Sequence, residues 1–255
     1  MTDAVLRHGA ASHVGNVREL NEDAFLVAPP VFAVADGMGG HDHGDVAARF
    51  VVEELAALGG RTYDAATAVT AVAGALTAVH ERIDAYEAAQ RAAGRPLFSA
   101  GTTAVVAVLV EDPADPRWLL ANLGDSRAYR VAGDRLEQVT VDHSLVQELV
   151  DAGTLSASAA AGHPDRHVVT RALGGPVRHD ADFYSPPGGS RRAAAAVLRR
   201  CERDALRLRH PARPARDRAP RGGGGRRRRR RGRGRGARQR DRRRRRCDGI
   251  GRTHP

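Results

Sequence analysis

Short apolar segments and longer amphipathic segments follow one another along the first part of this 255-residue chain. Residues 5–6, 22–27 and 31–36 are apolar and bounded by Gly, Pro or Asn, which is the pattern of buried strands. From Gly44 to Leu58, and again from about Tyr63 to Ala92, apolar residues recur every three or four positions. This spacing predicts two amphipathic helices.

The strand pattern returns after Gly94 and Pro96. Three further strands are expected at 101–110, 117–125 and 126–140, the last containing an Ala-Gly-Asp turn, and a short helix at 143–153. Three strands, two helices and three strands without long crossovers favour antiparallel sheets covered by helices. We therefore predict an α+β fold and not a doubly wound parallel sheet.

The hydrophobic pattern stops near residue 185. Beyond it the chain is rich in Arg, Gly, Ala and Pro, and it contains runs of six and five arginines. Such a segment cannot bury enough apolar surface to offset an ordering cost of about 1–2 kcal/mol per residue. The expected organisation is a domain over residues 1–184 and a disordered tail over residues 185–255.

Charge divides the chain at the same place. Residues 1–185 hold 14 arginines against 25 acidic residues, a net charge of −11, whereas residues 186–255 hold 27 arginines against 5, a net charge of +22. The overall value of +11 describes neither part. An arginine run binds phosphates with a steep salt dependence, but no aromatic residues interleave it for base stacking. Any nucleic-acid binding by the tail is therefore expected to be non-specific.

The cysteines and the apolar runs indicate where in the cell the protein is expected. The two cysteines, Cys201 and Cys247, both lie in the tail, so no disulfide framework supports the first domain. The start of the chain has no signal-peptide pattern, and the longest apolar run, Ala104 to Val110, is too short to cross a bilayer. We expect a cytoplasmic monomer that does not enter membranes.

Four acidic motifs stand at strand ends or turns. Glu22 and Asp23 are adjacent, Asp36 precedes Gly37, Asp125 follows an apolar strand, and Asp142 precedes His143. Oxygen ligands without cysteine favour hard cations such as Mg²⁺ or Mn²⁺. Two such ions about 3.5–4 Å apart can activate a bridging water toward phosphorus. Arg18 could hold phosphate oxygens in a forked pair, and the Gly37 carbonyl could approach a metal closely.

Each motif also has a simpler interpretation. An Asp before Gly is more often a turn residue than a ligand, Asp125 could cap a turn, and Arg18 could be a solvated charge. His41 and His43 surround one Asp on a glycine-rich loop, where solvated histidines are more common than ligands. No single motif decides between these interpretations.

Together, six segments resemble bacterial metal-dependent serine/threonine phosphatases of the type 2C (PPM) family. In order they are VRELNEDAF, VFAVADGMGGHDHG, AGTTAVVAVLV, WLLANLGDSRAYR, VDHSLVQELVDAG and HPDRHVVTRALG. The resemblance covers about residues 5–180. It implies a four-layer αββα sandwich with the metal site at one edge of the paired sheets, here without the last strands.

The resemblance also implies roles for individual residues. Asp36 matches the aspartate that bridges both metals, and Gly37 the glycine whose carbonyl binds one of them. Glu22 and Asp23 match carboxylates that hold metal-bound waters. Arg18 matches the phosphate-binding arginine, and Asp125 the aspartate that helps to hold a third metal in bacterial members. Residues 143–167 resemble the mobile flap beside the cleft, and Met38 stands where many eukaryotic relatives have a histidine proposed as general acid.

The resemblance ends before two further motifs. A complete member continues after RALGG with a strand ending in Ser-Asp-Gly and later a Gly-x-Asp-Asn, both of which supply metal-binding aspartates. Cys247-Asp248-Gly249 comes too late and follows five arginines, so we regard it as chance. Read one base later, however, the codons from Arg191 to the start of Cys201 permit Gly-Glu-Arg-Leu-Leu-Leu-Cys-Ser-Asp-Gly. A shift of reading frame near Ser185 is favoured over a selected arginine tail.

Three functions follow from these observations. The first is a metal-dependent hydrolase that removes phosphate from Ser or Thr of proteins phosphorylated by a bacterial kinase, using two Mn²⁺ or Mg²⁺ ions and a third at Asp125. The second is a catalytically impaired phosphoprotein-binding module with a basic tail. The third is a non-functional frame-shifted product whose exposed strand edges promote aggregation.

Overall fold

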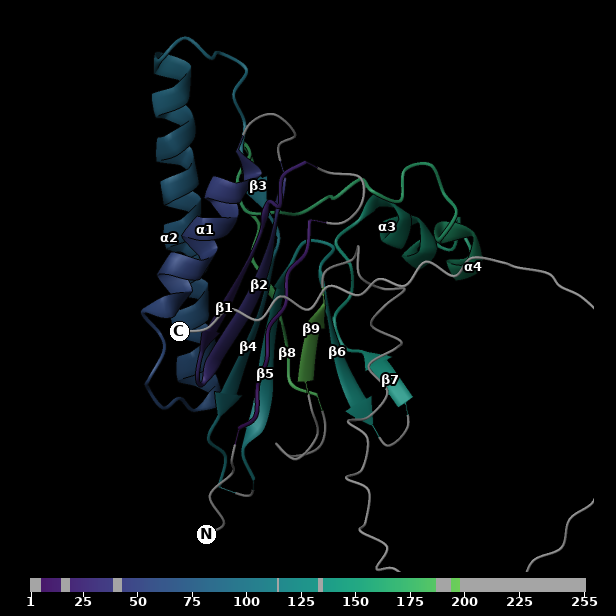
Figure 1. Ribbon diagram of the computed structural model, residues 1–255. Helices are drawn as coiled ribbons and strands as arrows, with labels where there is room; N and C mark the ends of the chain where they lie inside the picture. The colour runs from purple at the N-terminus through teal and green to yellow at the C-terminus, as the bar shows by residue number, and fades with distance from the viewer. Residues whose placement is uncertain are drawn as a thin grey trace, which may run out of the picture. The chain divides into compact units, whose positions relative to one another are not determined.

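The computed structural model describes residues 6–14, 19–38, 43–113, 115–132, 135–186 and, for the backbone alone, 194–197 (Figure 1). Arg18, His41 and the arginine runs therefore lie outside the described residues. The strand expected at residues 5–6 is absent at Leu6, which is in an irregular segment. No helix within the described ranges has the length and apolar character needed to span a membrane.

The main sheet is antiparallel throughout and has the strand order β1-β2-β4-β5-β8, with β3 paired to β2. Its strands are β1 (Asp23–Ala28), β2 (Val31–Met38), β3 (Gly101–Thr102), β4 (Ala104–Val110), β5 (Arg117–Leu123) and β8 (Asp182–Tyr184). Neighbouring strands β1 and β2, and β4 and β5, are hairpins, as the short connections predict. The antiparallel arrangement is thus confirmed.

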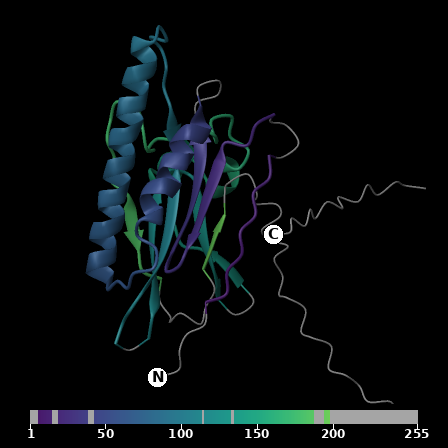
Figure 2. The ribbon, with the colours of Figure 1, turned by 60° about the vertical axis from the view of Figure 1, so that its left-hand side comes forward.

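Two helices cover one face of this sheet, α1 (Gly44–Ala56) and α2 (Ala65–Ala92) (Figures 1 and 2). Helix α2 begins at Asp64, whose side chain accepts a hydrogen bond from the Thr67 backbone N–H at 2.8 Å, while the Thr67 hydroxyl lies 3.1 Å from the Asp64 backbone N–H. The larger apolar core lies between the helices and the sheet and includes Val51, Leu55 and Val79. This helical layer is one of the two expected for the αββα sandwich.

A second, smaller sheet has the order β7-β6-β9. It consists of β6 (Arg127–Ala132), β7 (Arg135–Gln138) and β9 (Ala194–Val197). Ala128 of β6 packs with Val105, Ala107 and Leu120 of the main sheet to form a second apolar cluster. The two sheets therefore face each other across this cluster.

Strand β9 lies beyond the boundary expected near residue 185. The backbone of residues 194–197 pairs antiparallel with Arg127–Arg130 of β6. This short stretch, Ala-Ala-Ala-Val, is apolar, and strand pairing requires only backbone N–H and C=O groups. The strand was not predicted from the sequence because arginines on both sides dominate the average composition of this segment.

Short helices α3 (Leu145–Asp151) and α4 (Ala157–Ala160) follow β7. Each begins at a serine, Ser144 and Ser156, whose hydroxyl accepts a hydrogen bond from a backbone N–H of the first turn. An isolated bridge joins Ser144 to Val169, and the Thr170 N–H donates to the His143 carbonyl at 3.0 Å. These contacts close residues 143–170 into a loop whose two ends lie together.

Helix α2 also fastens the segment that follows this loop. His80 is buried, and its Nδ1 accepts a hydrogen bond from the Gly174 N–H at 3.3 Å. That bond requires Nδ1 to be unprotonated, so the neutral imidazole is the form that holds Gly174. Burial lowers the pKa of His80, and the nearby Arg178 lowers it further while Asp84 opposes the change.

We predict that Leu55→Ala lowers the free energy of unfolding by about 2–5 kcal/mol, because it leaves a cavity in the core where the side chain is fully buried. Urea denaturation measures the change. Leu97→Ala, at a side chain that is 92% exposed, is the control and should change the free energy by no more than about 0.5 kcal/mol. Equal losses in both variants would place Leu55 outside the core.

We also predict that stability falls as the pH is lowered below about 6.5, the ordinary pKa of histidine. The unfolded chain protonates His80 there, whereas the folded chain, in which the pKa is lowered, takes up that proton only at lower pH. His80→Asn keeps an acceptor for the Gly174 N–H and does not titrate. Urea denaturation between pH 7 and pH 5 should therefore show a shallower loss in the variant, and an identical slope would contradict the assignment.

Candidate functional site

Asp23 and Asp36 lie directly opposite each other in the β1–β2 hairpin. Residues opposite each other in an antiparallel pair point to the same face, with Cβ atoms about 4.5–5.5 Å apart. Asp36 is buried, being only 7% exposed. Like charges in this arrangement repel one another, so the pair is suited to a cation between or beside the two carboxylates.

Gly37, the next residue of β2, is in close contact with the start of α1 and with Glu22. Its N–H donates to the Glu22 carbonyl at 3.2 Å. A Cβ at this position would collide with the Gly44 carbonyl oxygen and lie 2.7 Å from the Glu22 carbonyl oxygen. A Cβ at Gly44 would in turn lie 3.1 Å from Glu22 Oε1. The Glu22 carboxylate thus lies near Gly44, beside the end of β2, and only glycine fits at residue 37.

Thr103 connects the end of β2 to the turn that carries Asp125. Its hydroxyl lies 3.1 Å from the Asp36 N–H, which donates to it, and 2.7 Å from the Ser126 hydroxyl. The Thr103 N–H donates to the Asp36 carbonyl at 3.0 Å. Asp125, 7% exposed, immediately precedes Ser126. The end of β2, the start of β4 and the segment after β5 are therefore held together.

The Asp125 turn is further fixed by His143. The Gly124 N–H donates to His143 Nδ1 at 3.0 Å, so Nε2 carries the proton of the neutral ring and can donate to Asp182 Oδ2, which is 3.0 Å away. Burial lowers the pKa of His143, and Asp182 partly opposes this change. Arg171 binds both carboxylate oxygens of Asp182, at 3.3 and 3.0 Å. Although burial alone would raise it, these hydrogen bonds hold the pKa of Asp182 below its usual value.

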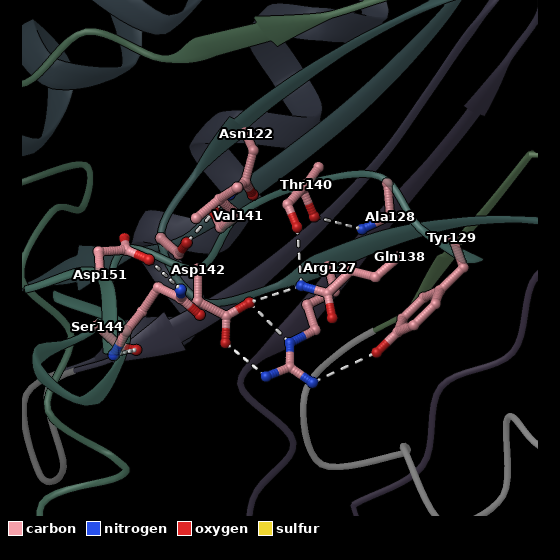
Figure 3. A network of polar contacts seen from close by, with 12 residues as sticks. Asn122, Arg127, Ala128, Tyr129, Gln138, Thr140, Val141, Asp142, Ser144 and Asp151 are labelled. Carbon is pink, nitrogen blue, oxygen red and sulfur yellow. Dashed lines mark hydrogen bonds and ion pairs between the residues drawn. The ribbon is translucent and has the colours of Figure 1, made fainter. Parts of the chain in front are cut away.

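Asp142, the fourth acidic motif, pairs with arginine. Figure 3 shows Arg127 Nε and Nη2 donating to the two Asp142 oxygens, at 2.7 and 2.6 Å, with Gln138 Nε2 3.1 Å from Oδ1. The Asp142 side chain is 2% exposed and that of Arg127 19%. This forked pair satisfies Asp142 as a structural group. Although burial opposes it, the bond to Asp142 raises the pKa of Arg127.

The remaining sequence candidates have simpler surroundings. His43 precedes α1 with a left-handed backbone (φ 65°), lies 4.0 Å from Asp45 and stacks on Phe98 with ring centroids 6.2 Å apart. Arg18 and His41 are outside the described residues. Within the described ranges, no three His, Cys, Asp or Glu side chains converge closely enough to hold a metal ion. The hard-oxygen donors fit Mg²⁺ or Mn²⁺ in type, but the described carboxylates do not form a complete ligand set.

Three residues that position the site were not predicted. Thr103 and Arg171 lie in segments that carry the resemblance, but neither they nor Asp182 were given a role, and their partners are 23 and 11 positions away. A buried hydroxyl at the start of an apolar strand, such as Thr103 before Ala104, is the one signal that could have indicated a bonded partner.

Comparison with known proteins identifies the family. The family model described as Protein phosphatase 2C matches residues 11–170. The serine/threonine phosphatase stp of Listeria monocytogenes is 34% identical over 181 residues, which cover 68% of this chain and 69% of that protein. PstP of Mycobacterium tuberculosis, a serine/threonine protein phosphatase, is 37% identical over 171 residues, 67% of this chain and 32% of its own length.

Solved structures agree with this result. The M. tuberculosis PstP/Ppp structure superposes with a TM-score of 0.58 at 32% identity, covering 68% of this chain and 71% of that one. Stp1 of Staphylococcus aureus gives a TM-score of 0.57 at 31% identity, with 67% of each chain covered. The chain therefore belongs to the protein phosphatase 2C (PPM) family, whose members named here are protein serine/threonine phosphatases.

The buried Arg127–Asp142 pair should be essential to stability. Asp142→Ala removes the carboxylate from a largely buried guanidinium, and we expect it to cost about 3–5 kcal/mol of the free energy of unfolding. Asp84→Ala removes the partner of Arg178 in an exposed pair, with side chains 45% and 54% exposed, and should cost less than about 1 kcal/mol. Urea denaturation compares the two variants. If the losses were equal, burial would not explain the importance of the pair.

Proposed function

We propose that this protein domain is built for metal-dependent hydrolysis of phosphoserine and phosphothreonine in proteins. The observation that carries the proposal is the opposition of Asp23 and Asp36 in one hairpin, with Asp36 joined through Thr103 to the turn of Asp125. A related PstP catalytic domain, with a TM-score of 0.52 and 29% identity, was solved with two manganese ions. The family membership and this relative support Mn²⁺ or Mg²⁺ as the ions.

The residues would divide the work as follows. Asp36 and the Gly37 carbonyl would hold the ions directly, Glu22 and Asp23 through water, and Asp125 a third ion. When bound, the ions would supply an activated water and a clamp on the phosphate oxygens. Arg18 would bind the phosphate and orient it. We further propose a cytoplasmic monomer whose substrates are phosphorylated by a bacterial Ser/Thr kinase.

We also infer that the chain with this amino-acid sequence is catalytically impaired. Strand β9 supports it, because residues 194–197 occupy a strand position while their sequence, Ala-Ala-Ala-Val, brings no carboxylate. Read one base later, the codons of residues 191–200 permit Gly-Glu-Arg-Leu-Leu-Leu-Cys-Ser-Asp-Gly. The four codons of β9 would then permit Leu-Leu-Leu-Cys, a better buried strand that leads directly into Ser-Asp-Gly.

The same shift explains the later arginines. One base later, the codons of residues 236–245 permit Gly-x-Asp-Asn-Val-Thr-Val-Val-Val-Val, in which the run beginning at Arg242 becomes a valine strand. This shifted sequence contains the expected Gly-x-Asp-Asn motif. The same one-base shift therefore permits both this motif and Ser-Asp-Gly. We therefore infer that the tail is an out-of-frame reading of the family's last strands, and that two metal-binding aspartates are lost with it.

Restoring the reading frame after Ser185 should raise the rate of manganese-dependent hydrolysis of a phosphothreonine peptide at least about 100-fold. The reason is that even residues behind the metal ligands commonly contribute 10–100-fold. Asp36→Ala in the restored protein should abolish the activity. If the present chain were as fast as the restored one and also lost its activity with Asp36→Ala, the missing aspartates would be unnecessary and the proposal of impairment would fail. Inactivity of the restored protein would contradict the phosphatase proposal itself.

A further inference from the structure

A pocket of about 420 Å³ lies beside the end of β2. Met38 forms one wall, and residues between His167 and His179 form the others. None of the residues named above as metal-site candidates lines it. It is therefore a separate feature that adjoins the candidate metal site.

The distance from this pocket to Asp36 suits a peptide. Asp36 and Met38 are two residues apart in a strand, so their side chains point to the same face and their Cα atoms are about 7 Å apart. Residues one or two positions apart in an extended peptide span about 3–7 Å. A peptide with its phosphorylated residue at Asp36 can therefore place a neighbouring side chain at Met38.

The walls of the pocket are tied to the metal-site strand. Met38 is opposite Gly101 in the β2–β3 pair, and Thr102 exchanges two backbone hydrogen bonds with Leu173, at 3.0 and 2.9 Å. His80 holds the next residue, Gly174, through its N–H. The pocket wall is thus fixed to β3 by the two backbone bonds of Leu173 and to α2 by the His80 side chain.

The described lining of the pocket contains basic side chains but no acidic ones. Arg171, His167 and His179 line the pocket, and among its described lining residues none is acidic. Arg171 is held in place by Asp182 and by the Asp180 carbonyl, which fixes the direction of its planar guanidinium. Thr170, another lining residue, has a buried hydroxyl for which the described residues provide no hydrogen-bond partner. These groups together favour an anionic, hydrogen-bonding occupant.

We propose that this pocket binds an acidic side chain, one or two residues from the phosphorylated residue, in the peptide substrate. The proposal rests on the proposed phosphatase function for the position of the peptide. It assigns a preference for flanking acidic residues to Arg171, Thr170 and the two histidines.

The test uses the full chain and fluorescence anisotropy with four labelled peptides. Two contain phosphothreonine and two contain threonine, and within each pair the residues flanking it are either Glu or Gln. The Glu peptides should bind about threefold to fivefold more tightly than the Gln peptides, the range expected for partly exposed ion pairs.

Val177 and Val168 offer matched variants. Both are exposed, at 56% and 44%, but only Val177 lines the pocket. Val177→Glu should abolish the preference for Glu peptides, whereas Val168→Glu should leave it intact. The proposal is overturned if the wild-type chain shows no preference, or if both variants reduce it equally.

Comparing the phosphorylated with the unphosphorylated peptides tests the phosphatase proposal separately from the pocket proposal. If phosphorylation did not strengthen binding in the presence of Mn²⁺, even in the frame-restored protein, the phosphatase site would be in doubt. A preference for Glu that Val177→Glu removes would still support an acidic-peptide pocket in that case. Phosphate-dependent binding without a preference for Glu would overturn the pocket alone.

Discussion

The Thr103 hydroxyl, buried where three strands end, is the contact on which the arrangement of the site depends. It accepts a hydrogen bond from the Asp36 N–H and lies 2.7 Å from the Ser126 hydroxyl. A single side chain therefore fixes the ends of β2 and β5 relative to β4. A buried hydroxyl without partners would cost free energy, and this one has partners both in β2 and in the turn after β5. The positions of Asp36 and Asp125 are therefore coupled through it.

Electrostatics distinguishes the acidic residues that build the fold from those suited to chemistry. Asp142 has a forked arginine partner, and Asp182 has Arg171 and His143. Asp36 lies directly opposite another acidic residue, Asp23, in the β1–β2 pair. Two carboxylates opposite each other on one sheet face favour a bound cation, which is why this hairpin is the candidate site.

The sequence predicted much of the fold because its patterns are local. Alternation and three-to-four spacing located both long helices and the strands around Asp36 and Asp125, and the two-residue connection between β1 and β2 set Asp23 opposite Asp36. The bonds from His143 to Asp182 and from His80 to Gly174 join residues 39 and 94 positions apart. Such contacts depend on how elements pack, which periodicity does not encode, and the basic pocket beside Met38 arises in the same way. The roles of the individual site residues stay predictions.

Strand β9 illustrates that a chain can keep the strand pairing of a fold without keeping the side chains that bind metal. Strand pairing uses backbone groups that every residue except proline has, so a short run of small apolar residues can take a strand position next to β6 whatever it replaces. Metal binding uses particular side-chain oxygens, and no backbone pairing can supply a missing aspartate. The proposed change of reading frame would preserve the first property by chance of the code and lose the second. Resemblance in shape to active phosphatases is therefore compatible with weak catalysis by this chain, and the effect of restoring the frame depends on the carboxylates it returns.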